Sequence, residues 1–256
     1  MRRKIALFAS GTAGLSVARL LQENIEDEVS MLVLADQNQS LDAQIEAVFS
    51  VGAKPIIFRG DLRSDPTAVI EMISNSDIDS LITVYWPFIL PESVFRNLEI
   101  TVNFHPALLP INRGWYPHVH NILNGTAAGV TLHELSREAD TGAIWAQKNV
   151  EIFSWDTAGD LHARLQQEII KLFEAEWPKI RTKEIIPTVQ SEDLATYNSK
   201  KALDGIDLID LNEMITAGKF INFLRARTFG SNGYAYFLDS DGNKVHVKIE
   251  LERKTK

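Results

Sequence analysis

The sequence predicts an α/β fold: a mostly parallel sheet with helices on both faces, followed by a small C-terminal unit of a helix and a β-hairpin. Three observations predict it. Apolar runs alternate with amphipathic segments through the first half, the pattern of parallel strands joined by helices. A longer helical segment near the middle carries one apolar stripe. The last segment alternates apolar and polar residues on either side of a turn sequence.

The apolar runs predict buried strands in a Rossmann-like order. We expect strands at residues 4–9, 29–35, 55–58, 81–85 and 100–104, and two more at 129–135 and 143–152. The amphipathic segments between the first five predict helices at residues 14–23, 41–51, 66–74 and 91–97. A further helix begins at Asp156 or Thr157, and its inward stripe is Leu161, Leu165, Ile169 and Leu172.

The chain turns polar and irregular over residues 187–199, which predicts a domain boundary. We expect a catalytic domain at residues 1–185 and a C-terminal extension at 186–256 that serves dimerisation or substrate support. Asp210 with Glu213 predicts a capping box that opens a helix through about Arg225. The hairpin follows as residues 234–238, a turn, and an alternating strand from Val245. One helix and one hairpin cannot bury a core alone, so this unit must pack on the main domain or on a partner.

Composition excludes several classes of function. The chain has no cysteine, which removes disulfides, thiolate metal sites and a cysteine nucleophile. Its formal net charge is −8, whereas proteins that bind nucleic acid over a wide surface need a basic face. No apolar stretch approaches the length of a membrane span. The short apolar run after the basic start is too short for a secretion core, and we expect it to form the first strand. We therefore expect a cytoplasmic protein with a small-molecule substrate, no nucleic-acid partner and no membrane.

A glycine-rich turn follows the first strand. Ser10-Gly11-Thr12-Ala13-Gly14 opens a helix, as nucleotide-binding turns do, but it lacks one glycine of the dinucleotide fingerprint. We interpret it as a tight turn and helix start. The alternative is an NAD-dependent enzyme, with Asp36 at the end of the next strand as the ribose acceptor.

The segment that carries chemistry begins at Asn103. By alternation, Asn103 and His105 leave their strand on the same side, at the carboxyl end where such sheets bind ligands. Pro106 stops the strand, and a loop with Leu108-Leu109-Pro110 follows. A histidine in this position is often only a structural hydrogen-bonding residue, so the segment needs further support. That support comes from Arg113-Gly114 and, later, Asp140-Thr141-Gly142.

Asn-x-His, Leu-Leu-Pro, Arg-Gly and Asp-Thr-Gly, in this order, resemble the core of the folate-dependent formyltransferases. The resemblance covers about residues 1–185. It implies 10-formyltetrahydrofolate as co-substrate, no metal, and acyl transfer to an amine. It also implies that Asn103 donates to the growing oxyanion, that His105 takes the amine proton or stabilises the intermediate, and that Asp140 holds the imidazole.

The resemblance also implies a folate slot. One wall would be the segment after the fourth strand, with Trp86, Phe88, Ile89 and Leu90. The other would be the loop that carries Glu138 and Asp140. Core packing at a strand end is the alternative interpretation of residues 86–90.

Arg113, Gly114, Trp115 and Tyr116 resemble the version of this loop found in sugar N-formyltransferases. The implied acceptor is a nucleotide-linked dideoxy-amino sugar, most simply dTDP-4-amino-4,6-dideoxyglucose. Aromatic faces suit a sugar or a base, and an arginine suits a diphosphate. Asn198 and Lys200 are candidate contacts to the same substrate, although the pair Lys200-Lys201 also fits a solvated surface.

Three rivals remain open. Methionyl-tRNA formyltransferases share the core but normally carry a longer C-terminal barrel and a basic path for tRNA. Glycinamide ribonucleotide formyltransferases usually end near the main domain. A non-catalytic nucleotide-binding regulator would need no Asn-x-His with a matching aspartate. The alternating apolar face of the hairpin predicts a homodimer. The other histidines match no metal motif and are interpreted as structural: His118, His120, His133, His162 and His246.

Overall fold

The computed structural model describes residues 2–52, 54–59 and 66–254. The chain divides into two compact units. The first unit comprises Met1–His105, Thr131–Gln147 and Ile169–Gln190, and the second comprises Pro106–Val130, Lys148–Glu168 and Ser191–Lys256. Each is described by itself below. The expected boundary near residue 185 stays a prediction.

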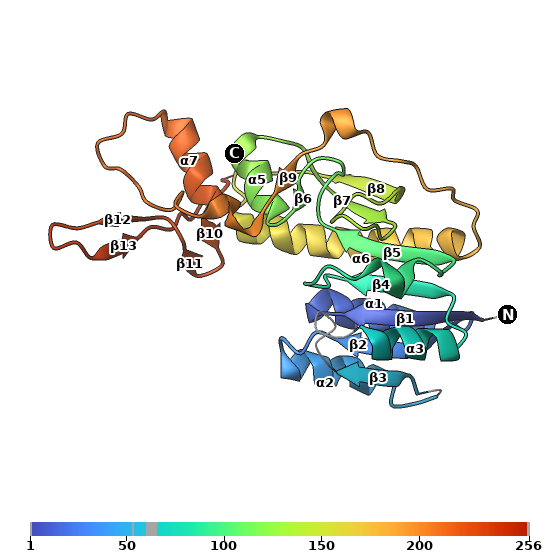
Figure 1. Ribbon diagram of the computed structural model, residues 1–256. Coiled ribbons are helices and arrows are strands. Elements are labelled where there is room, and N and C mark those ends of the chain that lie inside the picture. Colours follow the sequence, from blue (N-terminus) through green and yellow to red (C-terminus); the bar gives the residue numbers. More distant parts are fainter. Residues whose placement is uncertain (1, 53, 60–65, 255–256) are drawn as a thin grey trace. The chain divides into compact units, whose positions relative to one another are not determined.

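A seven-stranded sheet dominates the fold (Figure 1). Across the sheet the strands are β3 (Ile56–Arg59), β2 (Asp27–Leu34), β1 (Arg3–Ala9), β4 (Ser80–Val84), β5 (Ile100–His105), β7 (Ala128–His133) and β8 (Ile144–Val150). The pairs from β3 to β5 are parallel, and β7 is antiparallel to β5. The predicted mostly parallel α/β sheet is therefore confirmed. Each expected strand is present, with ends that differ by at most two residues.

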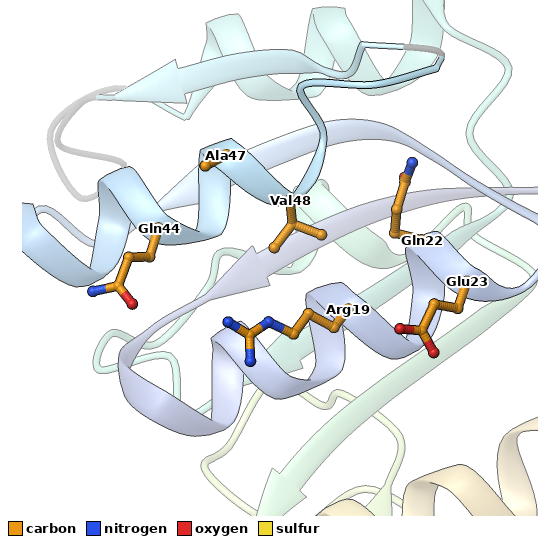
Figure 2. A pocket seen from close by; sticks show the side chains of 6 residues that line it. All are labelled: Arg19, Gln22, Glu23, Gln44, Ala47 and Val48. Carbon is orange, nitrogen blue, oxygen red and sulfur yellow. The ribbon is translucent and has the colours of Figure 1, made fainter.

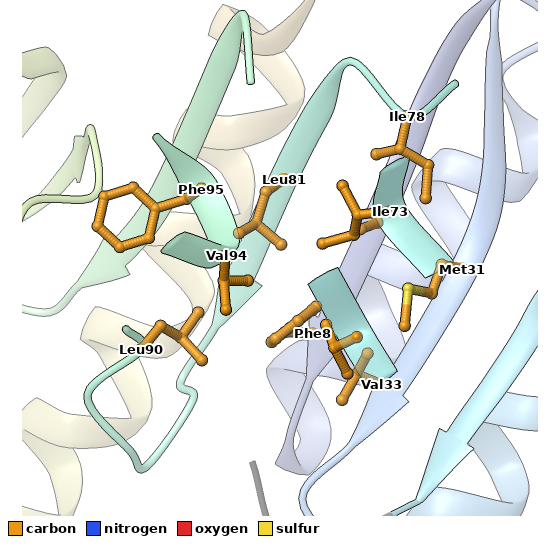
Figure 3. Packing of buried hydrophobic residues seen from close by; sticks show 11 residues of the cluster. Phe8, Met31, Val33, Ile73, Ile78, Leu81, Leu90, Val94 and Phe95 are labelled. Carbon is orange, nitrogen blue, oxygen red and sulfur yellow. The ribbon is translucent and has the colours of Figure 1, made fainter. Parts of the chain in front are cut away.

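Helices cover both faces of the sheet because its central strands are apolar on both sides. One face packs under α3 (Thr67–Asn75) and α4 (Glu92–Phe95), where a cluster joins these helices to alternate strand residues such as Phe8 and Met31 (Figure 3). The residues between them in β1, Ile5 and Leu7, are fully buried as well. The helices α1 (Gly11–Glu23) and α2 (Gln39–Val48) pack on each other, and α1 also contacts the central strands.

The glycine-rich turn has a packing role in the structure. Gly11 adopts a positive φ of 66° at the start of α1. At Gly14 an added Cβ would lie 3.0 Å from the Ala9 side chain, so glycine lets the helix approach the strand more closely than a larger residue would without a small shift. These contacts agree with a tight turn and helix start.

The helix α6 (Ala158–Arg181) begins as the sequence predicts. Thr157 and Asp160 cap it reciprocally: the Asp160 carboxylate accepts from the Thr157 backbone N–H, and the Thr157 hydroxyl oxygen accepts from Asp160 N at 3.4 Å. The predicted inward stripe is confirmed, because Leu161, Leu165 and Ile169 are fully buried and Leu172 is 8% exposed.

In the second unit the predicted capping box is wrong. The Asp210 side chain accepts from the backbone of Asn212 in a local turn, and helix α7 (Ala217–Ala226) instead begins after Thr216, whose hydroxyl accepts from Lys219 N. Asp210 and Glu213 thus lie in a loop, since side chains of this type stabilise turns as readily as helix starts. The hairpin is confirmed as β12 (Tyr236–Leu238) paired antiparallel with β13 (Lys244–His246).

Several short elements of the second unit were not expected. The helix α5 (Pro117–Asn124) follows a left-handed residue, Tyr116, and starts with a proline. Short pairings join β6 (Arg113–Gly114) to β9 (Tyr197–Asn198) and β10 (Thr228–Phe229) to β11 (Asn232–Gly233). Two short 3-10 turns, Glu192–Leu194 and Lys200–Leu203, flank β9.

A buried histidine pair in this unit is expected to lower its stability in acid. The His118 ring lies 4.8 Å from that of His162 and packs against Phe229. Burial, with smaller contributions from His162, His120 and Arg227, lowers the pKa of His118 to about 3. In the unfolded chain a histidine has a pKa near 6.5. Below that pH, His118 therefore binds a proton in the unfolded state but not in the folded state.

Stability is therefore expected to fall as the pH drops below about 6.5, and the loss continues toward the folded pKa. From His118 alone, the free energy of unfolding should be about 2 kcal/mol lower at pH 5 than at pH 7. Urea unfolding of the wild type and a His118→Leu variant at pH 7, 6 and 5 checks this, because the variant lacks that share of the pH dependence. Equal pH dependence in both proteins would contradict the prediction.

In the part of the chain that the structure covers, we find no helix with the length and apolar character to span a bilayer. A surface depression between α1 and α2 holds none of the predicted site residues (Figure 2). Its lining is Arg19, Gln22, Glu23, Gln44, Ala47 and Val48.

Candidate active site

A row of side chains crosses three neighbouring strands at the carboxyl end of β4. Thr83 of β4 is in register with Asn103 of β5, and Asn103 is in register with His133 of β7. Residues in register on paired strands present their side chains to the same face. The row is joined by hydrogen bonds: Thr83 Oγ1 donates to Asn103 Oδ1 at 2.7 Å, and Asn103 Nδ2 lies 3.0 Å from His133 Nε2.

These contacts fix the orientation of the Asn103 amide. His133 Nδ1 lies 2.7 Å from the Glu134 carbonyl oxygen, so this nitrogen must carry the proton and donate it. His133 Nε2 then accepts from Asn103 Nδ2; a proton on Nε2 would place two donors face to face. The amide nitrogen therefore points away from Thr83, toward His133 and Asp140.

Asp140 completes the group that the sequence predicts. Its Oδ1 accepts from Asn103 Nδ2 at 3.4 Å, and its Oδ2 lies 3.5 Å from His105 Nδ1. Asp140 itself comes from the loop between β7 and β8, and its φ is 57°. The His105 and Asp140 side chains are 6% and 13% exposed, so water screens this pair little. The structure thus brings Asn103, His105 and Asp140 together from two distant segments.

Two further side chains of this row, Thr83 and His133, were not among the predicted site residues. We interpreted His133 as structural, yet it contacts Asn103 and lies 3.5 Å from Asp140 Oδ1. The neighbouring Glu134 has its pKa raised by burial, an effect that His133 partly offsets. A histidine at the end of an apolar strand was the available signal, but the strand register that pairs it with Asn103 is not visible in the sequence.

The residues predicted to form the folate slot lie after β4. Trp86 makes edge contacts to Phe8 at 5.1 Å and to Phe88 at 5.8 Å, and Leu90 is buried in the cluster of Figure 3. Ile89 by contrast is 69% exposed. Glu138 is exposed, and its carbonyl oxygen accepts from Ser136 and Thr141 in the loop that carries Asp140.

A planar, hydrogen-bonding ring system fits this first wall. Trp86 Nε1 and the Tyr85 hydroxyl are buried atoms with no hydrogen-bond partner among the described residues. Burial alone raises the pKa of Tyr85, so this hydroxyl stays protonated and can donate. These donors belong to the same short segment as the exposed Ile89. A segment that combines unpaired buried donors with an exposed apolar side chain would suit a pterin, which has apolar faces and polar edges. Within the ranges that the structure covers, no cluster of three or more histidine, aspartate or glutamate residues is arranged to bind a metal.

The other predicted substrate contacts belong to the second unit. Lys200 Nζ lies 5.0 Å above the ring of Trp115, which is 38% exposed, and the Tyr116 ring lies 5.8 Å from that of Trp115. Asn198 Nδ2 donates to Asn112 Oδ1, which ties β9 to the loop before β6. The side chains of Lys200, Trp115 and Tyr116 thus form one aromatic and cationic group. The Asn198 backbone carbonyl accepts from Trp115 N at 2.8 Å and so holds the Trp115 backbone.

Arg113 forms an ion pair that the sequence does not predict. Its buried guanidinium donates to both carboxylate oxygens of Glu192, at 2.8 and 3.0 Å. Arg113 in turn lowers the pKa of the exposed Glu192. A diphosphate would have to compete with this bidentate ion pair, so the role of Arg113 as a phosphate ligand stays a prediction.

Gly114 is required by close packing. Its φ is 87°, and an added Cβ would overlap the Asn198 carbonyl oxygen. A Gly114→Ala variant is expected to lose about 3 kcal/mol of stability or more, from backbone strain and from separation of β6 and β9. Urea unfolding measures this loss. Gly205→Ala is the matched control: φ is 80° with nothing within 4 Å, so only strain of about 1–2 kcal/mol is expected. Equal losses in the two variants would refute the packing argument.

Most of the chain is similar to known proteins. Residues 3–175 match the family described as formyl transferase, and residues 202–253 match the N-formyltransferase dimerization C-terminal domain. A dTDP-4-amino-4,6-dideoxyglucose formyltransferase of Mycobacterium tuberculosis is 38% identical over 151 residues. That match covers 59% of this chain and 64% of the relative, slightly less than two thirds of its length.

Two solved structures are similar over most of the chain. A 4-N formyltransferase from Francisella tularensis has a TM-score of 0.84 at 26% identity, and the match covers 98% of this chain and 99% of that one. An N-formyltransferase from Helicobacter canadensis, in complex with folinic acid and dTDP-3-aminofucose, has a TM-score of 0.63, with coverage of 88% and 80%. At 19% identity the second likeness concerns the fold alone. The family match extends over more than half of the sequence and includes all three predicted catalytic residues, and the chain belongs to the formyl transferase family.

Proposed function

We propose that this protein transfers the formyl group of 10-formyltetrahydrofolate to the amino group of a nucleotide-linked dideoxy-amino sugar, with dTDP-4-amino-4,6-dideoxyglucose as the preferred acceptor. The observation that carries the proposal is the meeting of Asn103, His105 and Asp140 at the end of β5. The choice of acceptor rests on the mycobacterial relative, which is named for that sugar.

The reaction forms one C–N bond and breaks another. The acceptor amine attacks the formyl carbon, negative charge grows on the formyl oxygen, and the bond to N10 of the folate then breaks. The amine loses a proton, and N10 gains one, so no oxidant or other reactant is needed. The three side chains match these demands: a neutral amide that donates, an imidazole that exchanges protons, and a carboxylate.

Asn103 is suited to the oxyanion because its amide nitrogen is held in place before the substrate arrives. Its Oδ1 is occupied by Thr83, and one N–H is directed to His133. The other N–H makes only the longer contact to Asp140, at 3.4 Å. We propose that this N–H donates to the formyl oxygen in the reaction, because a preoriented donor stabilises the growing charge most.

His105 then handles the amine proton, and Asp140 orients and polarises its ring. The separation of 3.5 Å between His105 Nδ1 and Asp140 Oδ2 is longer than a hydrogen bond, and such contacts commonly shorten when substrate binds. In the second unit, Trp115 and Lys200 offer an aromatic face and an ammonium group, which suit the base and the phosphates of the nucleotide.

The test is a transfer assay read by mass spectrometry. The full-length protein is incubated with 10-formyltetrahydrofolate and a panel of acceptors: dTDP-linked 3-amino and 4-amino dideoxyhexoses, a UDP-linked amino sugar, glycinamide ribonucleotide and charged methionyl-tRNA. We expect one formyl group on the dTDP-linked 4-amino sugar. Transfer only to the tRNA or to glycinamide ribonucleotide would overturn the choice of acceptor, and transfer to none would overturn the proposal.

We also propose that the second unit forms a homodimer. Its segment 202–253 matches a dimerization domain, and the loop before α7 presents Leu211 at 66% and Met214 at 97% exposure. Such apolar side chains are stabilised when a second copy covers them. Sedimentation of the full-length protein at micromolar concentration should show a dimer; only monomer would refute this proposal.

A further inference from the structure

The loop that carries Asp140 must hold one particular shape. Its ends are joined where Glu134 N donates to Ala143 O at 2.8 Å. Gly142 packs so tightly on Glu134 that an added Cβ would overlap the carbonyl oxygen of that residue. Asp140 has a positive φ of 57°, a conformation that is uncommon in residues with a side chain, although aspartate adopts it more readily than most. The position of the carboxylate therefore depends on contacts that hold this backbone.

Gln190 supplies such a contact from far along the chain. Its side-chain Nε2 donates to the carbonyl oxygen of Asp140 at 2.9 Å and to that of Gly142 at 2.7 Å. Gln190 is 7% exposed, so these bonds are shielded from competing water. Both acceptors are carbonyls, which settles the amide orientation, since the flipped amide would face two oxygens with its own.

The backbone places Gln190 beside the loop. Thr188 and Ile144 exchange hydrogen bonds in an antiparallel bridge, with N···O distances of 2.8 and 2.9 Å. This bridge lies directly after the Asp140 loop and directly before Gln190. The side chain thus reaches back across the bridge to the loop. Within the loop, the hydroxyl groups of Ser136 and Thr141 both donate to the Glu138 carbonyl oxygen and so stabilise its shape.

We propose that Gln190 is a positioning residue for the formyl transfer: its amide holds the backbone of residues 140–142 so that the Asp140 carboxylate faces Asn103 and His105. The role in transfer rests on the proposed function, whereas the role in holding the loop does not. Gln190 touches neither substrate nor the reacting atoms in this assignment; it acts through Asp140.

The first test replaces Gln190 by methionine, which keeps the length of the side chain but removes both donors. We expect kcat to fall roughly 10- to 100-fold, because a displaced catalytic group costs rate even when it is still present. KM for the amino sugar should change less than about twofold, since the acceptor site is left intact. Gln22→Met is the matched control, because Gln22 Nε2 also donates to a carbonyl, Val51 O, but in the α1 region. The proposal is wrong if the two variants lose rate equally.

A double-mutant cycle separates positioning from general damage. Once Asp140→Asn has removed the carboxylate, the added Gln190→Met change should lower kcat by less than about threefold, because there is no carboxylate left to position. If the second change costs the same factor with and without the carboxylate, Gln190 acts independently of Asp140, and the proposal fails.

Hydrogen exchange tests the structural step without any turnover. Amide exchange in peptides that cover residues 135–144 should be at least about tenfold faster in Gln190→Met than in the wild type, and unchanged in Gln22→Met. Equal protection in all three proteins would overturn the proposal. If the wild type transfers formyl to no acceptor, the proposed function fails, but this measurement still decides whether Gln190 holds the loop.

Discussion

An Asn103→Ala variant is expected to lose about 100- to 1,000-fold in kcat, the usual cost of removing one oxyanion donor. The amide is held by Thr83 and His133, so its N–H groups are oriented before the transition state forms. Alanine leaves the formyl oxygen without this donor, and water cannot replace it at the same angle. Steady-state kinetics with saturating folate and acceptor measure the loss, and thermal unfolding confirms that the variant folds.

Two further variants make this measurement decisive. Thr83→Val removes the hydroxyl that fixes Asn103 Oδ1 but keeps the amide, so a smaller loss of about tenfold is expected. Asn38→Ala is the control. The Asn38 side chain caps α2 by accepting from Leu41 N, so its removal should lower the free energy of unfolding by about 1 kcal/mol and leave kcat unchanged. A kcat for Asn103→Ala within threefold of the wild type would exclude Asn103 as the oxyanion donor.

The sheet could be predicted from the sequence because its strands are buried on both faces. A nearly continuous apolar run such as residues 4–9 is stable mainly as a central strand of a sheet that is covered on both faces. Strands and helices of this kind reveal themselves by local periodicity. The stripe of α6 is the clearest case: Leu161, Leu165 and Ile169 repeat at helical spacing, and all three are buried.

Elements that depend on distant contacts could not be predicted. The pairing of β6 with β9 involves two residues on each side, and it rests on Gly114 approaching Asn198. The true start of α7 is Thr216, yet Asp210 offered an equally good local signal. A side-chain oxygen near a free backbone N–H stabilises a turn or a helix start alike, and only tertiary packing decides between them.

Some residues of the candidate site could also be predicted from local sequence patterns, whereas others depend on distant contacts. Asn103 and His105 could be assigned to one side of a strand by alternation alone, whereas Asp140 came only from the family resemblance. His133 joins them through the register between β5 and β7. Gln190 lies 50 residues after Asp140 in the chain and joins the site through hydrogen bonds to the loop that it holds. Register and loop closure are set by the whole fold. Residues that support a site in this way are therefore found in the structure and not in the sequence.

Replacing His105 by alanine is expected to lower kcat by about 100- to 10,000-fold, the range for a group that transfers a proton in the transition state. His105 is buried at the end of β5, and its Nδ1 lies 3.5 Å from the Asp140 carboxylate. The size of the loss is read from kcat under saturating conditions. A loss below about tenfold would show that the proton leaves the amine by another route.

Asp140→Asn should lower kcat by a factor similar to that of His105→Ala. The amide that replaces the carboxylate keeps the shape of the side chain but cannot stabilise a charged imidazole. Asp140 contacts Asn103 as well as His105, so its replacement disturbs both the proton path and the oxyanion donor. The two residues are then expected to act as one unit: the double variant His105→Ala, Asp140→Asn should be no more than about threefold slower than the slower single variant. Losses that multiply would show that Asp140 serves the reaction without His105, and its function would then lie with Asn103 or with the folate. Measuring kcat for all four proteins on the same acceptor therefore decides which side chain the carboxylate assists.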